Sequence, residues 1–139
     1  MTIRVFPSDE KFYKWEQTTS WYKRNSQHIS LEECQALVNK VRKDYKYRPR
    51  IFVKDGRGSV YGRALHGPGL KNPEIHLPLW ARNKCLVLHE LAHILNPKLE
   101  PFQHGPSYLR TYMVLAEKYL KIDPVKAILH SRFFGVRIK

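Results

Sequence analysis

The sequence predicts an α+β domain in which a small, mainly antiparallel sheet of three or four strands packs against helices. Three short runs between residues 50 and 77 are rich in β-branched and aromatic residues and are bounded by glycine and proline. Helical patterns, with apolar residues three and four positions apart, precede and follow these runs. Because a chain of 139 residues can bury a core without disulfides, we expect a single domain over residues 1–139.

The first part of the chain, residues 1–25, is a basic and aromatic segment. Aromatic and cationic side chains are interleaved over residues 11–24, and such a surface can stack bases and hold phosphates. The alternation of Tyr13 and Trp15 about Lys14 favours a second interpretation, a strand or extended segment that packs onto the core.

The first well-signalled helix is predicted to begin at Ser30 and to end near Tyr45. Ser30 and Glu33 have the spacing of a capping box, in which each side chain accepts a hydrogen bond from the backbone of the other. The helix should bury a stripe made of Leu31, Cys34, Leu37, Val38 and Val41.

Three strands are expected next. Residues 50–54 form the first strand, and residues 55–58 form a turn whose glycines favour positive φ. Residues 59–65 should return as its antiparallel partner. Residues 74–77 form the third strand, which we expect at the edge of the sheet, where an extended peptide can add by main-chain hydrogen bonds.

The C-terminal part contains a further predicted helix and a tail. Asp123 has the position of an N-cap and Pro124 that of a first helical residue, so a helix should run toward Phe133. The remaining residues, 134–139, form a basic tail or a last strand.

The strongest chemical signal is the sequence His89-Glu90-Leu91-Ala92-His93, in a predicted helix that begins near Arg82 and stops before Pro97. Histidines four positions apart lie one turn above each other, so both imidazoles can reach one metal ion. Glu90 lies about 100° around the helix from His89, where a carboxylate can take a proton from a metal-bound water. This is the HExxH pattern of zinc peptidases.

A catalytic zinc ion usually has three protein ligands, so the chain must supply a third. We predict His104, which stands before a helix that begins near Pro106. Glu117 on that helix and Glu100 in the connecting loop are the alternatives. Cys85 lies one turn before His89 but is expected to be a small core residue, because a fourth protein ligand would leave no water to activate.

These two motifs resemble those of the SprT-like zincins, including the Spartan type of protease for DNA–protein crosslinks. The second motif of that group reads HGP, any residue and an aromatic, and here it is His104-Gly105-Pro106-Ser107-Tyr108. The sequence is still more similar to a small metallohydrolase family of actinobacteria and their phages, which has counterparts of residues 49–58 and 75–82. The likeness begins near residue 12, but only the histidine motifs are specific. Tyr108 replaces the common Phe, and the cysteine-rich zinc ribbon of many SprT proteins has no counterpart, so the catalytic domain itself would make any nucleic-acid contact.

The resemblance implies one zincin-like metallopeptidase domain that hydrolyses peptide bonds. Zinc would be bound by His89, His93 and His104, and Glu90 would be the general base that activates a water. One further donor should stabilise the oxyanion of the peptide carbonyl. The sequence offers Tyr108 and His76 as candidates for this oxyanion or substrate contact, with Tyr112 and Arg82 beside them.

The charge of the chain bears on its partners. Lys and Arg number 25 against 12 Asp and Glu, a net charge of +13, which attracts polyanions and makes their binding salt-dependent. DNA or another nucleic acid is therefore a candidate partner beside the protein or peptide substrate, although the sequence does not identify nucleic-acid-binding residues. An acidic protein would be attracted by the same field.

Two rival functions stay open, and the composition predicts where the protein is located in the cell. One rival is a nucleic-acid-binding module with a structural zinc, and the other is a regulatory peptidase for a specific repressor or toxin. Only two cysteines, Cys34 and Cys85, no apolar leader after Met1 and no run of membrane-spanning length predict a cytoplasmic protein without a membrane partner.

Overall fold

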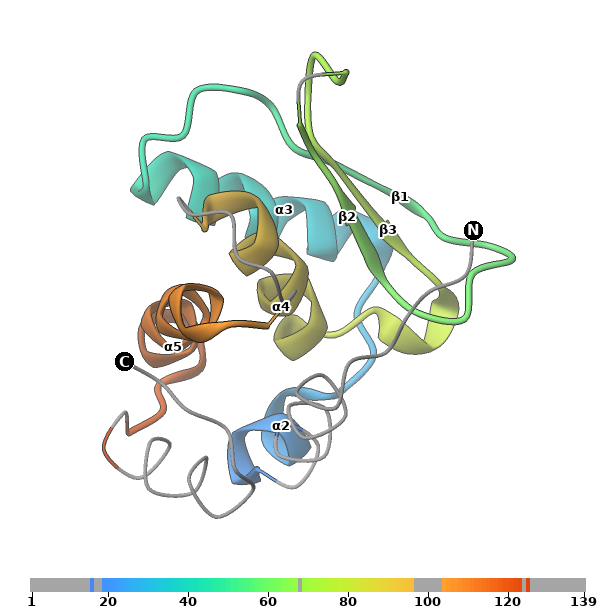
Figure 1. Ribbon diagram of the computed structural model, residues 1–139. Helices are drawn as coiled ribbons and strands as arrows, with labels where there is room; N and C mark the ends of the chain where they lie inside the picture. Colours follow the sequence, from blue (N-terminus) through green and yellow to red (C-terminus); the bar gives the residue numbers. More distant parts are fainter. Residues whose placement is uncertain (1–15, 17–18, 68, 97–103, 124, 126–139) are drawn as a thin grey trace. The chain divides into compact units, whose positions relative to one another are not determined.

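The structure is a computed structural model that describes residues 16, 19–67, 69–96, 104–123 and 125 (Figure 1). These residues form eight helices and strands. In chain order the elements are α2 Ser20–Asn25, α3 Leu31–Asp44, β1 Phe52–Asp55, β2 Arg63–Leu65, β3 Glu74–Leu77, the 3-10 helix η1 Leu79–Ala81, α4 Lys84–Leu95 and α5 Pro106–Leu120. The predicted α+β class is confirmed. The chain divides into two units, Asn25–Ile94 and Met1–Arg24 with Leu95–Lys139, and each is described by itself.

The sheet belongs to the unit Asn25–Ile94 and is mixed rather than mainly antiparallel. Its order is β1-β3-β2, with β1 parallel and β2 antiparallel to β3. Two sequence expectations are therefore wrong, because β2 does not return beside β1 and β3 is the central strand rather than the edge. The connection from β1 to β2 covers residues 56–62, which is longer than a tight hairpin turn. Ile75 and Leu77 of β3 are fully buried, which suits the centre of the sheet.

A close approach of backbones explains why β1 and β2 are kept apart. The amide of Gly56 donates to the Leu77 carbonyl over 2.9 Å, directly after the end of β1. A Cβ at Gly56 would lie 2.8 Å from the Leu77 carbonyl carbon and 2.8 Å from the Pro78 nitrogen, so only glycine fits. The segment that follows β1 therefore packs against the end of β3 before it turns toward β2.

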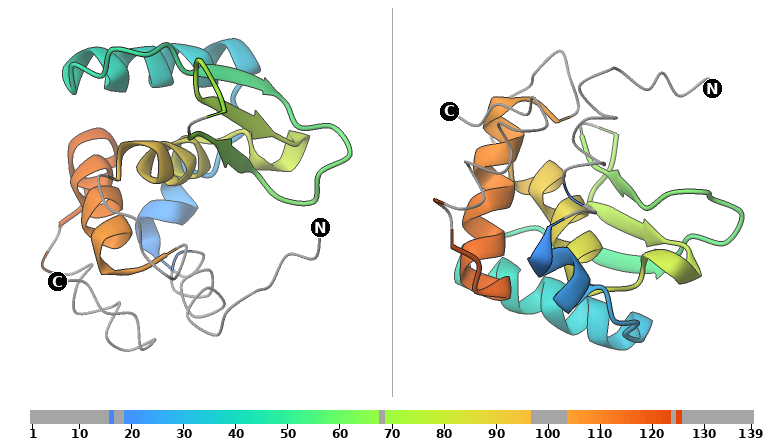
Figure 2. Two further views of the ribbon diagram at one scale, coloured as in Figure 1. Left: turned by 45° about the horizontal axis from the view of Figure 1, so that its top comes forward. Right: turned by 90° about the horizontal axis from the view of Figure 1, so that it is seen from below.

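Helix α3 has the capping box that the sequence predicted. The Ser30 hydroxyl accepts from the Glu33 amide at 3.0 Å, and the Glu33 carboxylate accepts from the Ser30 amide at 3.3 Å. The Gln35 side chain then donates to the Ile51 carbonyl over 2.8 Å and accepts from the Val53 amide over 2.7 Å. This side chain closes the outer edge of β1, and α3 lies beside that strand (Figure 2).

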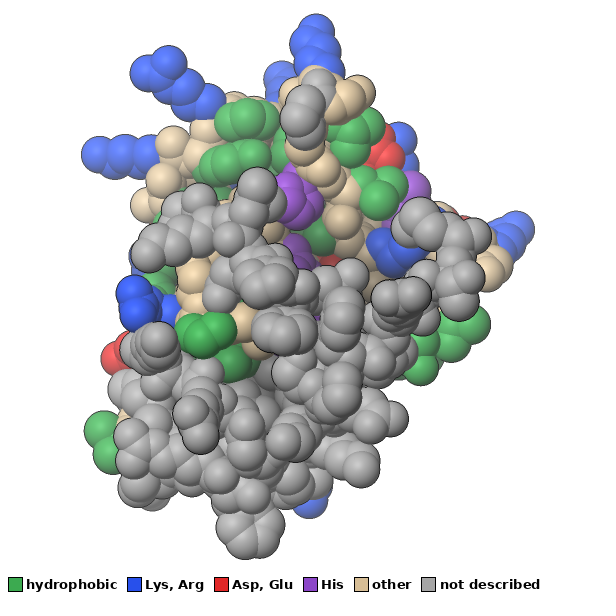
Figure 3. Space-filling view, viewed as in Figure 1, with side chains coloured by type: hydrophobic (Ala, Val, Ile, Leu, Met, Phe, Trp, Pro, Cys, Tyr) green, Lys and Arg blue, Asp and Glu red, His purple; other side chains and the backbone are tan. Residues whose placement is uncertain are grey.

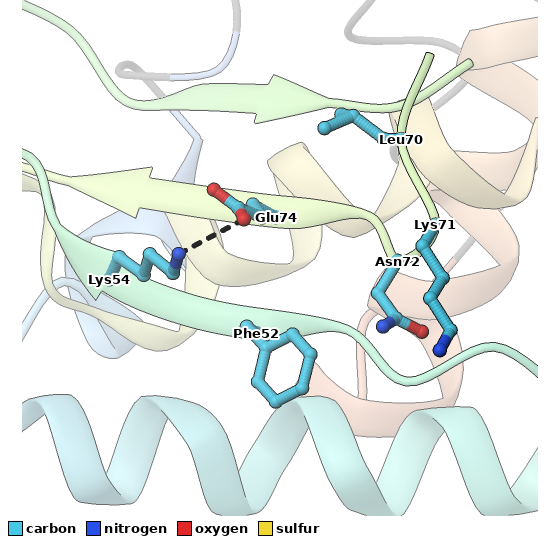
Figure 4. A pocket seen from close by; sticks show the side chains of 6 residues that line it. All are labelled: Phe52, Lys54, Leu70, Lys71, Asn72 and Glu74. Carbon is cyan, nitrogen blue, oxygen red and sulfur yellow. Dashed lines mark hydrogen bonds and ion pairs between the residues drawn. The ribbon is translucent and has the colours of Figure 1, made fainter. Parts of the chain in front are cut away.

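The other face of the sheet is polar. Side chains of Glu74 and His76 alternate with the buried Ile75 and Leu77, so they point to the opposite face. Lys54 of β1 forms an ion pair with Glu74 at 3.0 Å on that face (Figure 4). An open hollow of about 390 Å³ lies there, lined by Phe52, Lys54, Leu70, Lys71, Asn72 and Glu74. None of the predicted site residues lines it.

The unit that contains the chain ends is described in part. Ser20–Asn25 is helical and Trp21 is buried, whereas Tyr13, Trp15 and the tail 134–139 lie outside the described residues. The Asp123 carboxylate accepts from the Val125 amide over 2.9 Å, as an N-cap does, and the rest of that predicted helix also lies outside. Among the described helices, none has the length and apolar character that a bilayer crossing requires.

Candidate metal centre

Helix α4 carries the first two candidate ligands and is buried on almost every side. Its residues from Cys85 to Ala92 are all buried, including His89 at 2% and Glu90 at 6% exposure. The Asn83 side chain accepts from the Leu86 amide over 2.9 Å and so caps the helix, one residue later than the predicted start near Arg82. A buried, capped helix holds its side chains in fixed positions.

Three histidines converge. His89 and His93, one turn apart, hold their rings edge to face with centroids 5.4 Å apart. His89, His93 and His104 each have one ring nitrogen that lies within 4.8 Å of such a nitrogen on the other two. Three imidazoles at this spacing can hold a metal ion. The structure thus brings together the three ligands that the sequence predicted.

His104 is held by the start of its own helix. Gly105 is the N-cap residue of α5 with an extended backbone, and Pro106 occupies the first helical turn, where a missing amide hydrogen costs nothing. The Tyr108 ring lies edge to face on the His104 ring, with centroids 4.9 Å apart. Tyr112 in turn lies beside Tyr108 at 6.1 Å. These stacked rings are buried and fix the orientation of the His104 imidazole.

Glu90 lies beside this group. Its Oε1 is 4.0 Å from Nε2 of His89. Gly62, directly before β2, lies against the same carboxylate, because a Cβ there would be 3.2 Å from Glu90 Oε1 and 3.3 Å from Leu77 Cδ2. The carboxylate is therefore enclosed by the sheet on one side and points away from bulk water. A carboxylate at this place can accept a proton from a group bound between the histidines.

The other proposed ligands do not join the group. Glu117 is exposed on α5, and Cys85 is fully buried, as expected for a core residue. Neither belongs to the histidine group in the described part of the chain. Glu100 lies outside the described residues.

The candidate oxyanion donors have separate surroundings. His76 Nε2 is 2.9 Å from the Glu74 carboxylate, on the sheet face opposite to Leu77, and so it points away from Glu90. The hydrogen bonds from His76 and Lys54 lower the pKa of the Glu74 carboxyl below its ordinary value. Arg82 donates to Asp55 over 2.9 Å and to the Leu77 carbonyl over 3.3 Å, which is a structural role. Tyr108, beside His104, and Tyr112, beside Tyr108, remain as candidates.

Four further residues support the site, and their roles were not found from the sequence. Asn83 caps α4, and an asparagine directly before a long apolar run is a signal that could have revealed it. The Ser107 hydroxyl donates to the Asn96 side chain over 2.6 Å, and Gly62 leaves room for Glu90. The last two are contacts between segments far apart in sequence, for which no local pattern exists.

No family model, characterised protein or solved structure matches the chain.

Proposed function

We propose that the protein is a zinc-dependent peptidase of the SprT-like zincin type. The observation that carries the proposal is the convergence of His89, His93 and His104 within 4.8 Å, with the Glu90 carboxylate 4.0 Å from the first of them. A hydrolytic site needs a base beside its metal ligands, and the buried Glu90 carboxylate is in position to be one.

The donor set fits zinc. Three imidazole nitrogens with no sulfur ligand are the arrangement of catalytic zinc sites, which keep one position open. Within the described residues, the group that can hold the ion contains these three histidines alone. A closed structural site would require a fourth protein ligand.

Each residue of the site would have a separate role in hydrolysis. A zinc ion bound here would lower the pKa of a coordinated water to about 7 and polarise a peptide carbonyl. Glu90 would be the base that accepts a proton from the attacking water and returns it to the leaving amine. Tyr108, packed on His104, is the candidate to donate to the oxyanion.

The substrate would bind as an extended chain. Strand β2 lies at one edge of the described sheet and begins next to Gly62, which abuts Glu90. A peptide that adds to this edge by main-chain hydrogen bonds would pass close to the carboxylate. The net charge of +13 supports proteins near nucleic acid, or acidic proteins, as the pool from which substrates come.

The test is a comparison of Glu90→Gln with the wild-type chain, each loaded with zinc and incubated with casein and with mixed peptides. We expect Glu90→Gln to retain one zinc per chain and to lose hydrolysis by at least about 100-fold, the usual contribution of a general base. Glu117→Gln, a change at an exposed position on α5, is the matched control and should keep full activity. Equal hydrolysis by Glu90→Gln and wild type would refute the proposed base.

A further inference from the structure

Four large hydrophobic side chains are exposed together in the unit Asn25–Ile94. Val60 and Tyr61, before β2, are 71% and 52% exposed, and Leu79 and Trp80 of η1 are 66% and 52% exposed. We refer to these four residues as the apolar patch. Hydrophobic side chains reach the surface where η1 lies (Figure 3). Grouped exposed apolar side chains, unlike single ones, indicate a surface that binds something.

Direct contacts hold the apolar patch in one shape. The Trp80 indole nitrogen donates to the Val60 carbonyl over 2.7 Å, across 20 positions of sequence. The Tyr61 and Trp80 rings meet edge to face at 80°, with centroids 6.3 Å apart. The segment before β2 and the helix η1 are therefore joined, and their side chains form one surface.

The loop that carries Val60 and Tyr61 is also anchored at its start. Gly56 donates to the Leu77 carbonyl, and the Ser59 amide donates to the Gly56 carbonyl, both over 2.9 Å. Arg82, directly after η1, holds the Asp55 carboxylate at 2.9 Å. A surface fixed in this way loses little conformational entropy when it binds a partner.

The apolar patch adjoins the proposed catalytic carboxylate. Tyr61 is followed directly by Gly62, whose Cα lies against Glu90, and then by the edge strand β2. A chain lying along β2 and the segment before it would therefore pass both Glu90 and the apolar patch.

Basic residues outnumber acidic ones in the two segments that carry the apolar patch. Residues 55–63 and 78–84 contain four basic residues and one acidic residue: Arg57, Arg63, Arg82, Lys84 and Asp55. The Arg57 side chain is 91% exposed, and Arg63 and Lys84 are exposed as well. The partner that complements such a surface is apolar at its centre and acidic around it.

We propose that the apolar patch is the specificity surface of the enzyme and binds a bulky apolar side chain of an extended, acidic polypeptide substrate close to the scissile bond. This inference rests on the proposed peptidase function. Val60 and Leu79 are aliphatic and are the most exposed members of the patch. They favour a polypeptide over a nucleic acid, which stacks its bases on aromatic rings.

The test measures binding without turnover. Zinc-loaded Glu90→Gln protein is titrated into three labelled ten-residue peptides: an acidic peptide with one central Phe, the same peptide with Ser for Phe, and the Phe peptide with Lys for each Glu. We expect the acidic Phe peptide to bind at least about tenfold tighter than either of the others, as burial of one large apolar side chain allows. Val60→Ser and Leu79→Ser, each added to Glu90→Gln, should lose most of this preference.

Val114→Ser is the matched control, because Val114 is 47% exposed on α5, and it should bind like the parent. Equal binding of the three peptides, or a preference that survives both patch substitutions, would overturn the inference. Tighter binding of a ten-residue oligothymidine that both substitutions abolish would overturn it in favour of a nucleic-acid surface.

A cleavage arm separates this inference from the proposed function. The same peptides are incubated with zinc-loaded protein that retains Glu90. Selective binding without cleavage would contradict the proposed peptidase function and support the apolar patch as a polypeptide-binding surface. Cleavage with no preference for the Phe peptide would support the peptidase function and show that the apolar patch does not determine its specificity.

Discussion

The Ser107 hydroxyl donates a hydrogen bond to the Asn96 side-chain oxygen over 2.6 Å. Asn96 follows α4 directly, three residues after His93, and Ser107 lies three residues after His104 in the first turn of α5. The bond therefore ties together the two chain positions from which the second and third histidines are presented. Side chains that hold ligand-bearing segments contribute to metal affinity although they do not touch the metal.

Replacement of either partner of this bond should weaken zinc binding. We expect Ser107→Ala and Asn96→Ala each to lower the free energy of unfolding by about 1 kcal/mol and to reduce zinc affinity by roughly tenfold. Ser107→Thr keeps a hydroxyl and should bind zinc nearly as the wild type does. Competition with a zinc-binding dye measures the affinity, and the double variant should lose little more than one single variant. Fully additive losses would show that the two side chains act independently.

A second prediction concerns Gly62, which leaves space for the Glu90 carboxylate. A methyl group in Gly62→Ala would lie 3.2 Å from Glu90 Oε1, so the carboxylate must move by a few tenths of an ångström. We expect a small change in stability, unchanged zinc content and a fall in kcat of roughly tenfold or more, because misplaced bases lose rate steeply. Gly69→Ala is the matched control, since a Cβ at Gly69 meets no atom within 4 Å. If kcat of Gly62→Ala equals that of the control, Gly62 has no part in positioning the base.

The buried thiol of Cys34 should make the protein sensitive to alkali. Burial raises the pKa of this thiol from 9.0 to about 11, so the folded state keeps it protonated after the unfolded state has ionised. Its contribution to stability is complete below pH 9 and is lost as the pH rises from 9 to about 11, a loss of about 2–3 kcal/mol. Denaturant unfolding of wild type and Cys34→Ala at pH 8 and pH 11 measures it. The difference between the two proteins should shrink by that amount at the higher pH, and a constant difference would show that the thiol does not titrate this way.

The polar face of the sheet predicts how the stability of the protein changes at low pH. Hydrogen bonds from His76 and then Lys54 lower the pKa of Glu74. Because the folded pKa lies below the unfolded one, Glu74 stabilises the fold above its ordinary pKa of 4.5, and this stabilisation is lost as the pH falls through the lowered value. An NMR titration of the Glu74 side-chain carbon should have its midpoint below 4.5 in the wild type and at higher pH in His76→Phe. A midpoint unmoved by His76→Phe would contradict the assigned cause.

Local signals explain most of what the sequence could predict. The Ser30–Glu33 capping box and the spacing of His89 and His93 on one helix depend on neighbours along the chain, and the structure has them as expected. His104 was found because histidine, glycine and proline together mark the start of a helix near a ligand position.

The sheet order was not predictable in the same way. Strand pairing is decided by which segment buries most, and the fully buried Ile75 and Leu77 place β3 in the centre. The expected hairpin of β1 and β2 failed because Gly56 packs on the Leu77–Pro78 backbone, a contact between residues about 20 positions apart. The bonds of Ser107 with Asn96 and of Trp80 with Val60 are of the same long-range kind.

Zinc titration of the wild-type chain and of His104→Ala, followed by calorimetry and by X-ray absorption at the zinc edge, tests the central claim most directly. If His89, His93 and His104 hold one ion, the wild type will bind one zinc per chain through three imidazole nitrogens and one light non-protein ligand, and His104→Ala will bind far more weakly. A wild-type chain that binds no zinc, or one whose zinc site is unchanged in His104→Ala, would contradict the account.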